Sequence, residues 1–205
     1  MLLLALATGA WGAWSPSSFA DGDFRVQGAA AAVHEGELWS FGGRGIDTTV
    51  TSPPFEVTDQ VWAYNLTTDS WRKPSSGGGP SPRQDSSAVF VAQKLYVFGG
   101  LDGANTNQGD FWSFDSVALT WAQLSGGPVA RKGHASVVDG LGRVWILGGY
   151  VQGGATNLDA WIYDVGLGSW SQAADGPEAI ADHSAIYEPT GNGKIWILAP
   201  RRGCF

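Results

Sequence analysis

Cysteine is nearly absent from this chain, because the only one among 205 residues is Cys204, next to the C-terminal residue. An internal disulfide is therefore excluded. Charge is also scarce: 15% of the residues are charged, and 19 acidic residues face 12 basic ones. The net charge of −7 and the scattered Lys and Arg argue against a nucleic acid or an anionic membrane surface as the partner.

Long apolar runs are missing after the N-terminus, so we expect no membrane insertion there. The uncharged start MLLLALATGAWGAWSP, with its apolar run Leu2–Ala7, is typical of a signal peptide. No Lys or Arg precedes the run, which leaves a buried strand of the mature protein as the alternative. We predict a leader at 1–13 and a secreted or extracellular protein, with a cytoplasmic one as the alternative. Asn65 in NLT would then be a glycosylation acceptor, or else part of a plain turn.

Glycine and tryptophan are abundant, with 30 and 11 residues. Many glycines indicate many turns, and large flat rings need broad surfaces to pack against. With 205 residues, 43% of them hydrophobic, the chain can bury the core of one globular domain. This composition favours an all-β fold.

An apolar run that ends in two glycines recurs in ELWSFGG, KLYVFGG and RVWILGG. The pairs begin at Gly42, Gly99 and Gly148, and a fainter copy, KIWILAP, has Ala199–Pro200 instead. Two tryptophan series recur with steps of 50 and then 49 residues: Trp62, Trp112 and Trp161, and Trp71, Trp121 and Trp170. We expect the glycines to allow positive φ and a close backbone approach.

Each unit of about 50 residues offers four short strand candidates, which in the second copy are SSAVFVA, KLYVFGG, DFWSFD and TWAQLS. Four strands in such a repeat indicate a propeller blade. The glycine pair after the second strand, the aromatic near the end of the third and the tryptophan that opens the fourth resemble the kelch-repeat family in order and spacing. The resemblance covers Arg25 to Pro200. It implies an all-β, incomplete kelch-type β-propeller, with three four-stranded blades and partial blades at both ends.

The repeats divide residues 14–205 at about 25–82, 83–130, 131–180 and a half repeat at 181–200. The segment AWSPSSF is predicted to be a lone fourth strand. An open array leaves strand edges unpaired, so we expect self-association through them. The recurring tryptophans are interpreted as plates between blades. Asn65, Asp115 and Asp164 are interpreted as turn residues that bond the backbone.

The resemblance implies that the loops after the glycine pairs and before the first strands gather on one face, around the mouth of a central channel. Their polar, charged and aromatic residues suit recognition of a protein, peptide or glycan, although loops are polar in any case. The predicted partner-binding residues are Arg44, Asp47, Gln84, Asp85, Asp102, Lys132, Tyr150, Gln152 and Asp182.

Two histidines, His134 and His183, stand at equivalent repeat positions 49 residues apart. With a carboxylate such as Asp182 they could bind a metal. The resemblance favours a structural role instead, with a hydrogen bond to the neighbouring loop. We therefore predict no metal and no cofactor.

Some kelch-type propellers are enzymes, such as copper-radical sugar oxidases and sialic-acid mutarotases. The oxidase needs a tyrosine cross-linked to a cysteine, and Cys204 lies outside any matching blade. Neither a GxSxG nor an HExxH motif nor a phosphate-binding loop is present. We predict a noncatalytic interaction module that binds a protein or peptide partner, with a carbohydrate-binding or carbohydrate-active propeller (sugar oxidase or mutarotase-like) as the alternative.

Overall fold

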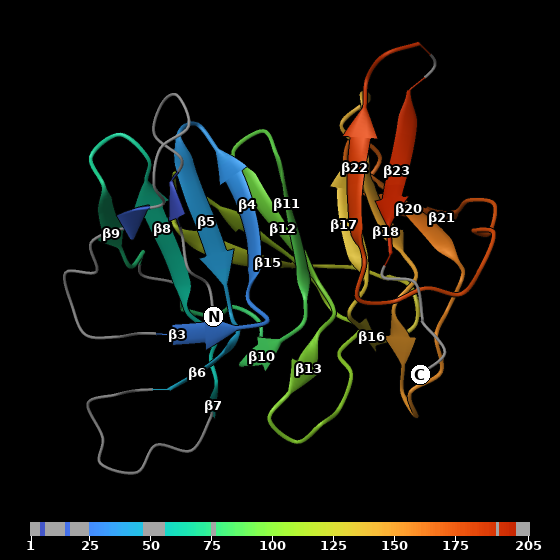
Figure 1. The fold of residues 1–205 in the computed structure, drawn as a ribbon, viewed down its shortest axis with the longest axis horizontal. Coiled ribbons are helices and arrows are strands. Elements are labelled where there is room, and N and C mark those ends of the chain that lie inside the picture. The colour runs from blue at the N-terminus through green and yellow to red at the C-terminus, as the bar shows by residue number, and fades with distance from the viewer. Residues whose placement is uncertain are drawn as a thin grey trace.

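The computed structural model describes residues 5–6, 15–16, 25–46, 56–74, 77–191 and 193–199. Every regular element in these residues is a β-strand. They include three four-stranded antiparallel sheets and a two-stranded sheet, which stand side by side with their first strands adjacent (Figure 1). The predicted incomplete β-propeller is confirmed. No helix in the described part of the chain is long and apolar enough to cross a membrane.

Each blade is a meander in which consecutive strands pair. The first blade contains β4 (Ala30–His34), β5 (Glu37–Phe41), β8 (Val61–Asn65) and β9 (Ser70–Arg72). The second contains β11 (Ser87–Val91), β12 (Lys94–Phe98), β14 (Phe111–Asp115) and β15 (Thr120–Leu124). The third contains β17 (Ala135–Val138), β18 (Val144–Leu147), β20 (Ala160–Asp164) and β21 (Ser169–Gln172). A half blade follows, with β22 (Ser184–Glu188) and β23 (Lys194–Leu198).

Short ribbons connect the blades at one end. The first contains β3 (Arg25–Gln27), β6 (Arg44–Ile46) and β7 (Glu56–Val57). The second pairs β10 (Arg83–Gln84) with β13 (Leu101–Asp102), and the third pairs β16 (Arg131–Lys132) with β19 (Tyr150–Val151). These ribbons lie below the blades in Figure 1, opposite the tight hairpin turns.

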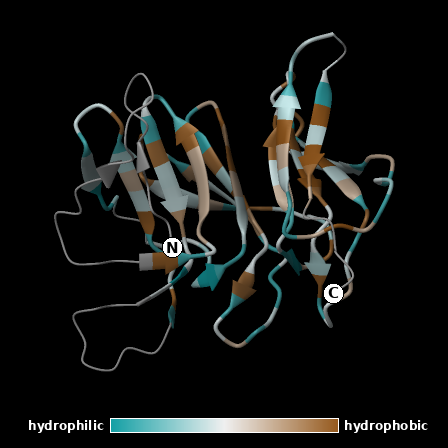
Figure 2. Cartoon of the chain, viewed as in Figure 1, coloured by the Kyte–Doolittle hydropathy of each residue, from teal (hydrophilic) through white to brown (hydrophobic). Residues whose placement is uncertain are grey.

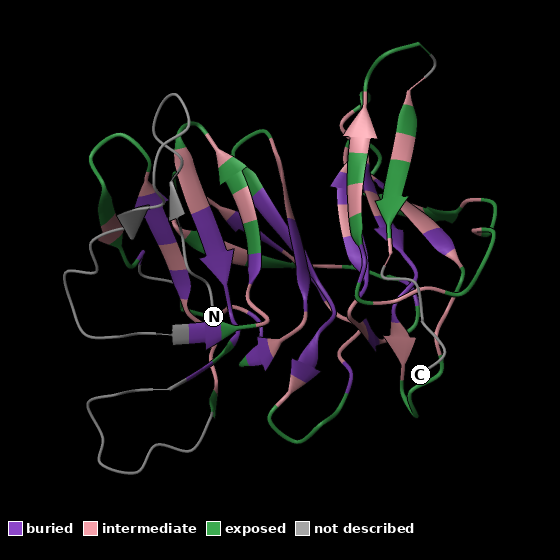
Figure 3. Ribbon diagram, in the orientation of Figure 1, coloured by how far each residue is buried: buried purple, intermediate pink, exposed green. Residues whose placement is uncertain are grey.

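The second strands are central and therefore carry the core. In β12, Tyr96 pairs with Val89 on one side and with Ser113 on the other, so both strand edges are hydrogen-bonded. Both sheet faces are also covered by neighbouring blades, and the strand is buried from Leu95 to Phe98. The fourth strands, by contrast, are mostly exposed (Figure 3). This pattern explains why the second strands are continuous apolar runs.

The glycine pairs make blade-to-blade contacts. The first glycine of each pair has a φ of 57–67° and the second a φ of 101–105°. A Cβ on Gly99 would lie 2.6 Å from the carbonyl oxygen of Arg131 in the next repeat. The second glycines donate N–H bonds across the same boundaries, from Gly43 to Arg83 O, Gly100 to Arg131 O and Gly149 to Ile180 O, over 2.8, 2.9 and 2.7 Å. Only a residue without a side chain allows this approach.

Trp121 and Trp170, from the fourth strands of the second and third blades, pack against the preceding blade, as predicted. The Trp121 ring lies 5.2 Å from Phe41, and the Trp170 ring lies 6.0 Å from Phe98. In the first blade Trp71 contacts Tyr64 of its own sheet. The rings fill the wedge between diverging sheets, where large flat side chains bury the most area.

The predicted turn residues also bond the backbone. The side-chain oxygens of Asn65 and Asp115 each accept two N–H bonds from residues two and three positions ahead, and Asp164 accepts one from Leu167. Asn65 thus acts as a turn residue, and its glycosylation stays a prediction.

The N-terminal prediction needs correction. Ser15–Pro16 form β2, which pairs with β1 (Ala5–Leu6) rather than standing as the fourth strand of a blade. The physical reason is that a fourth strand needs the edge of a third strand, and each of β8, β14 and β20 already pairs with its own fourth strand. The rest of the predicted leader, residues 1–13, lies outside the described residues.

The half blade exposes apolar side chains. Trp196 is 58% exposed and Leu198 78%, whereas the equivalent Tyr96 and Phe98 of β12 are buried. Figures 2 and 3 show hydrophobic residues on β23, a strand that is largely exposed. Self-association through this edge stays a prediction.

Candidate binding face

Backbone hydrogen bonds link the four repeats where each first strand begins. The N–H groups of Asp85, Gly133 and Asp182 donate to the carbonyls of Gly28, Asp85 and Gly133, over 2.8, 3.1 and 2.8 Å. All four residues have φ between 52° and 69°. This left-handed conformation suits glycine and costs an aspartate about 1 kcal/mol. The first and third repeats have glycine at this position, whereas the second and fourth have Asp85 and Asp182 despite this cost.

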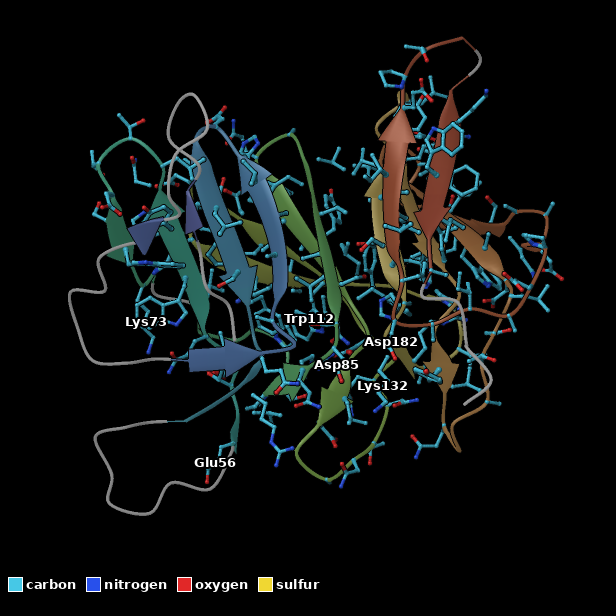
Figure 4. All side chains as sticks on the ribbon, in the orientation of Figure 1. Glu56, Lys73, Asp85, Trp112, Lys132 and Asp182 are labelled. Atoms are coloured by element: carbon cyan, nitrogen blue, oxygen red, sulfur yellow. The ribbon has the colours of Figure 1, made fainter. Side chains whose placement is uncertain are left out.

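Asp85, Lys132 and Asp182 lie close together at this inner rim (Figure 4). Burial raises the pKa of Asp85, the Lys132 ammonium and a 3.2 Å hydrogen bond from Gln84 lower it, and the Asp182 carboxylate raises it again. The rim thus combines two carboxylates with one ammonium group. Electrostatically it is a mixed surface with an acidic excess.

A first cavity of about 610 Å³ opens between the ribbons of the first two blades. Three of the predicted binding residues line it: Arg44, Gln84 and Asp102. Leu101 and Asn105 line it as well. The Asp102 carboxylate is less available to a ligand, because it accepts hydrogen bonds within its own loop. The donors are the backbone N–H groups of Ala104 and Thr106 and the side-chain Nε2 of Gln108.

A second cavity of about 360 Å³ lies between the ribbons of the second and third blades. It is lined by three other predicted residues, Lys132, Tyr150 and Gln152, and shares the wall formed by Leu101 and Asn105 with the first cavity. The loop 101–107 is therefore a ridge between two neighbouring cavities. Both volumes lie in the range of small-ligand sites.

The structure therefore brings six of the nine predicted residues into two adjacent cavities and sets Asp85 and Asp182 at the rim. Asp47 lies outside the described residues. The residue that sequence reasoning missed is Asn107, which bonds across to the next ribbon. A signal was present, because Thr-Asn recurs at 106–107 and 156–157.

Both histidines are buried. His134 Nε2 lies 2.7 Å from Ser87 Oγ in the neighbouring blade, and its ring packs on Phe98. Burial, Arg131 and His183 lower the pKa of His134 to about 3. Burial also lowers the pKa of His183, against the opposing effect of Asp182. No group of three metal-ligating side chains occurs in the described ranges.

His134 makes stability depend on pH. Its folded pKa of about 3 lies below the unfolded value of 6.5, so below pH 6.5 the unfolded chain binds the extra proton. We expect the free energy of unfolding to fall as the pH drops below 6.5, with a slope from this group that approaches about 1.4 kcal/mol per pH unit near pH 5. Urea denaturation of the wild type and of His134→Gln at pH 7, 6 and 5 measures it. Equal slopes for both proteins would contradict the buried neutral imidazole.

A family model and a solved structure both match most of this chain. The model of the KLHDC2/KLHL20/DRC7 Kelch-repeats domain matches residues 2–125 and 28–202. A solved structure described as "Structure of YjhT" superposes with a TM-score of 0.71 at 21% identity, over 85% of this chain and 59% of that one. At this identity the likeness concerns the fold.

Three curated relatives cover parts of the chain. N-(sulfonatooxy)prop-2-enimidothioate sulfolyase of Thlaspi arvense is 34% identical over 116 residues, 53% of this chain and 31% of that protein. Ras guanine nucleotide exchange factor F of Dictyostelium discoideum is 28% identical over 114 residues, 54% of this chain and 10% of that protein. Kelch-like protein 25 of Rattus norvegicus is 39% identical over 57 residues, 28% of this chain and 10% of that protein. The chain spans a third or less of these relatives.

Proposed function

This chain belongs to the kelch-repeat family, and from that premise we propose that it is a noncatalytic interaction module that binds a protein or peptide through the face formed by its connecting ribbons. The observation that carries the proposal is the pair of adjacent cavities at this face, lined by Arg44, Gln84, Lys132 and Tyr150. Neighbouring concave sites with mixed polar and apolar walls suit consecutive side chains of an extended partner.

Backbone hydrogen bonds between neighbouring repeats at this face support binding. The backbone bonds along the rim and those of the glycine pairs fix each ribbon relative to the next. The binding of a partner would therefore carry only a small entropic cost for ordering these loops. The acidic excess of the rim adds electrostatic selection among partners.

A triple variant tests the proposed face. We expect Arg44→Ser, Gln84→Ser and Tyr150→Ser together to weaken binding of a peptide selected from a display library by at least about tenfold, because truncated contacts at a binding centre cost about 1 kcal/mol or more each. Isothermal titration calorimetry measures the affinity.

The matched control truncates three exposed residues of the hairpin turns at the other end of the blades: Val117→Ser, Leu141→Ser and Leu167→Ser. We expect this variant to bind like the wild type. If the control loses affinity while the ribbon variant keeps it, the partner binds the opposite face and the proposal fails.

The alternative is a catalytic propeller with its site at the same face. The observation that favours it is the sulfolyase relative, whose name describes a lyase. A screen for glycan binding and for turnover separates the two functions. Turnover that Lys132→Gln or Tyr150→Phe abolishes would favour the enzyme.

A further inference from the structure

We propose that the cavity of about 360 Å³ between β13 and the β16–β19 ribbon is a subsite for the carboxylate side chain of an Asp or Glu within an extended peptide partner. This inference rests on the proposed function and names the chemistry that the subsite selects. Lys132 provides the positive charge, and Tyr150 and Gln152 form the wall.

The wall of this carboxylate subsite is organised before any ligand binds. The backbone N–H of Asn107 donates to Gln152 Oε1 over 2.9 Å, and its Nδ2 donates to the carbonyl of Tyr150 over 3.0 Å. Asn107 itself is 9% exposed. These two bonds link the connecting segments of the second and third blades at the wall of the cavity, so binding needs little reorganisation.

These hydrogen bonds also affect which polar groups of the cavity remain available to a ligand. They occupy acceptors, namely Gln152 Oε1 and the carbonyl of Tyr150, and the carbonyl of Val151 accepts from Gly154 over 3.0 Å. The polar side-chain groups that Lys132, Tyr150 and Gln152 bring besides these acceptors are an ammonium, a phenolic hydroxyl and an amide NH2. These groups can donate. Three acceptors of the subsite are thus engaged, and its donors include a cation, a combination that suits an anionic acceptor.

The charged residues around the cavity also favour an anionic ligand group. Among the described residues that line this cavity, Lys132 is the single charged side chain, whereas the neighbouring cavity has Arg44, Glu56 and Asp102. Leu101 and Val151 supply apolar wall for the methylene groups of a Glu or for an adjacent side chain. At the rim Asp85 interacts with Lys132, so it would repel an incoming carboxylate. Removal of the Asp85 carboxylate should therefore strengthen the binding of an acidic peptide, and the direction of this change can be measured.

The experiment titrates the full-length chain with four peptides of one length, followed by NMR shifts of the Tyr150 amide. The probes are Ac-Ala-Leu-Glu-Leu-Ala-NH2, the same peptide with Gln or Lys in place of Glu, and Ac-Ala-Leu-Gln-Leu-Ala with a free C-terminal carboxylate. We expect the Glu peptide to bind about tenfold more tightly than the Gln peptide, as charged hydrogen bonds imply.

Three variants complete the test. Lys132→Gln should abolish the preference for Glu over Gln. Asp85→Asn should tighten binding of the Glu peptide about two- to threefold, since it removes a partly screened repulsion. The control Lys73→Gln removes a charge over Trp62 in the first blade, away from this cavity, and should change nothing.

Several results would overturn the inference. Equal affinity for Glu and Gln, persistence of the preference in Lys132→Gln, or weaker binding in Asp85→Asn would each do so. Tighter binding of the peptide with the free C-terminus would assign the carboxylate to a chain end instead. If all peptides shift Tyr150 equally, the binding face stands and the carboxylate subsite does not; if the Glu peptide does not bind at all, the subsite fails outright.

Discussion

Replacing Arg131 by valine is expected to lower the free energy of unfolding by about 3 kcal/mol, because the change leaves the partly buried Asp159 carboxylate, with 14% of its side chain exposed, without its partner. Arg131 is fully buried and binds Asp159 through both terminal nitrogens, over 2.5 and 2.8 Å. It also donates to the carbonyl of Gly148 over 2.8 Å. Burial raises the pKa of Asp159, but the hydrogen bonds from Arg131 and Trp161 outweigh it and hold this pKa below its usual value.

The chain itself supplies the compensating variant. At the equivalent positions of the first blade stand Val26 and Gln60, and Gln60 Oε1 accepts the indole N–H of Trp62 as Asp159 accepts that of Trp161. We expect the double variant Arg131→Val with Asp159→Gln to recover most of the lost stability, since a neutral pair needs no counter-charge.

Urea denaturation of both variants at pH 7 measures the two differences. The surface pair Arg72–Glu37 provides the control, because Arg72 is 45% exposed and Arg72→Val should cost within about 1 kcal/mol. A double variant no more stable than Arg131→Val alone would show that the charge pair is not the cause.

Gly99→Ala is expected to destabilise the protein by about 2 to 5 kcal/mol, because the added Cβ meets both a backbone clash and an unfavourable φ. The Cβ would lie 2.6 Å from Arg131 O and 2.9 Å from His134 Cε1, at a φ of +62°. Neither neighbour can withdraw easily, because His134 is buried and the carbonyl of Arg131 accepts the N–H of Gly100.

Gly36→Ala separates the two costs. Gly36 has a φ of +77°, and a Cβ added there would meet nothing within 4 Å, so its substitution should cost only the roughly 1 to 2 kcal/mol of the left-handed backbone. Thermal unfolding of both variants makes the comparison. Equal losses would mean that the blades do not approach closely at Gly99.

The sequence was sufficient to predict the blades because the repeated residues have the same physical task in most copies. The glycine pair, the tryptophan of the fourth strand and the Asp or Asn of the turn each interact with neighbours at fixed distances along the repeat. The period of about 50 residues therefore predicted both the number of strands in each blade and the contacts between blades.

The candidate site was less predictable because its geometry depends on contacts between repeats. Loop position indicated Asp102, yet its carboxylate is used by its own loop. Asn107 was overlooked because a polar loop residue carries no sign of the bonds that it makes to the next ribbon. The pairing of Ser15–Pro16 was mispredicted for a similar reason, since a two-residue strand has no pattern that identifies its partner.

An NMR map of where a selected peptide partner binds tests most directly whether the ribbon face is the binding site. We expect amide shifts and exchange protection to concentrate at Gln84, Leu101, Lys132 and Tyr150, on both sides of the ridge 101–107. Val117, Leu141 and Leu167 at the opposite turns should stay unchanged. Perturbations confined to those turns, or to the exposed strand β23, would contradict the central claim that the ribbon face is the binding site.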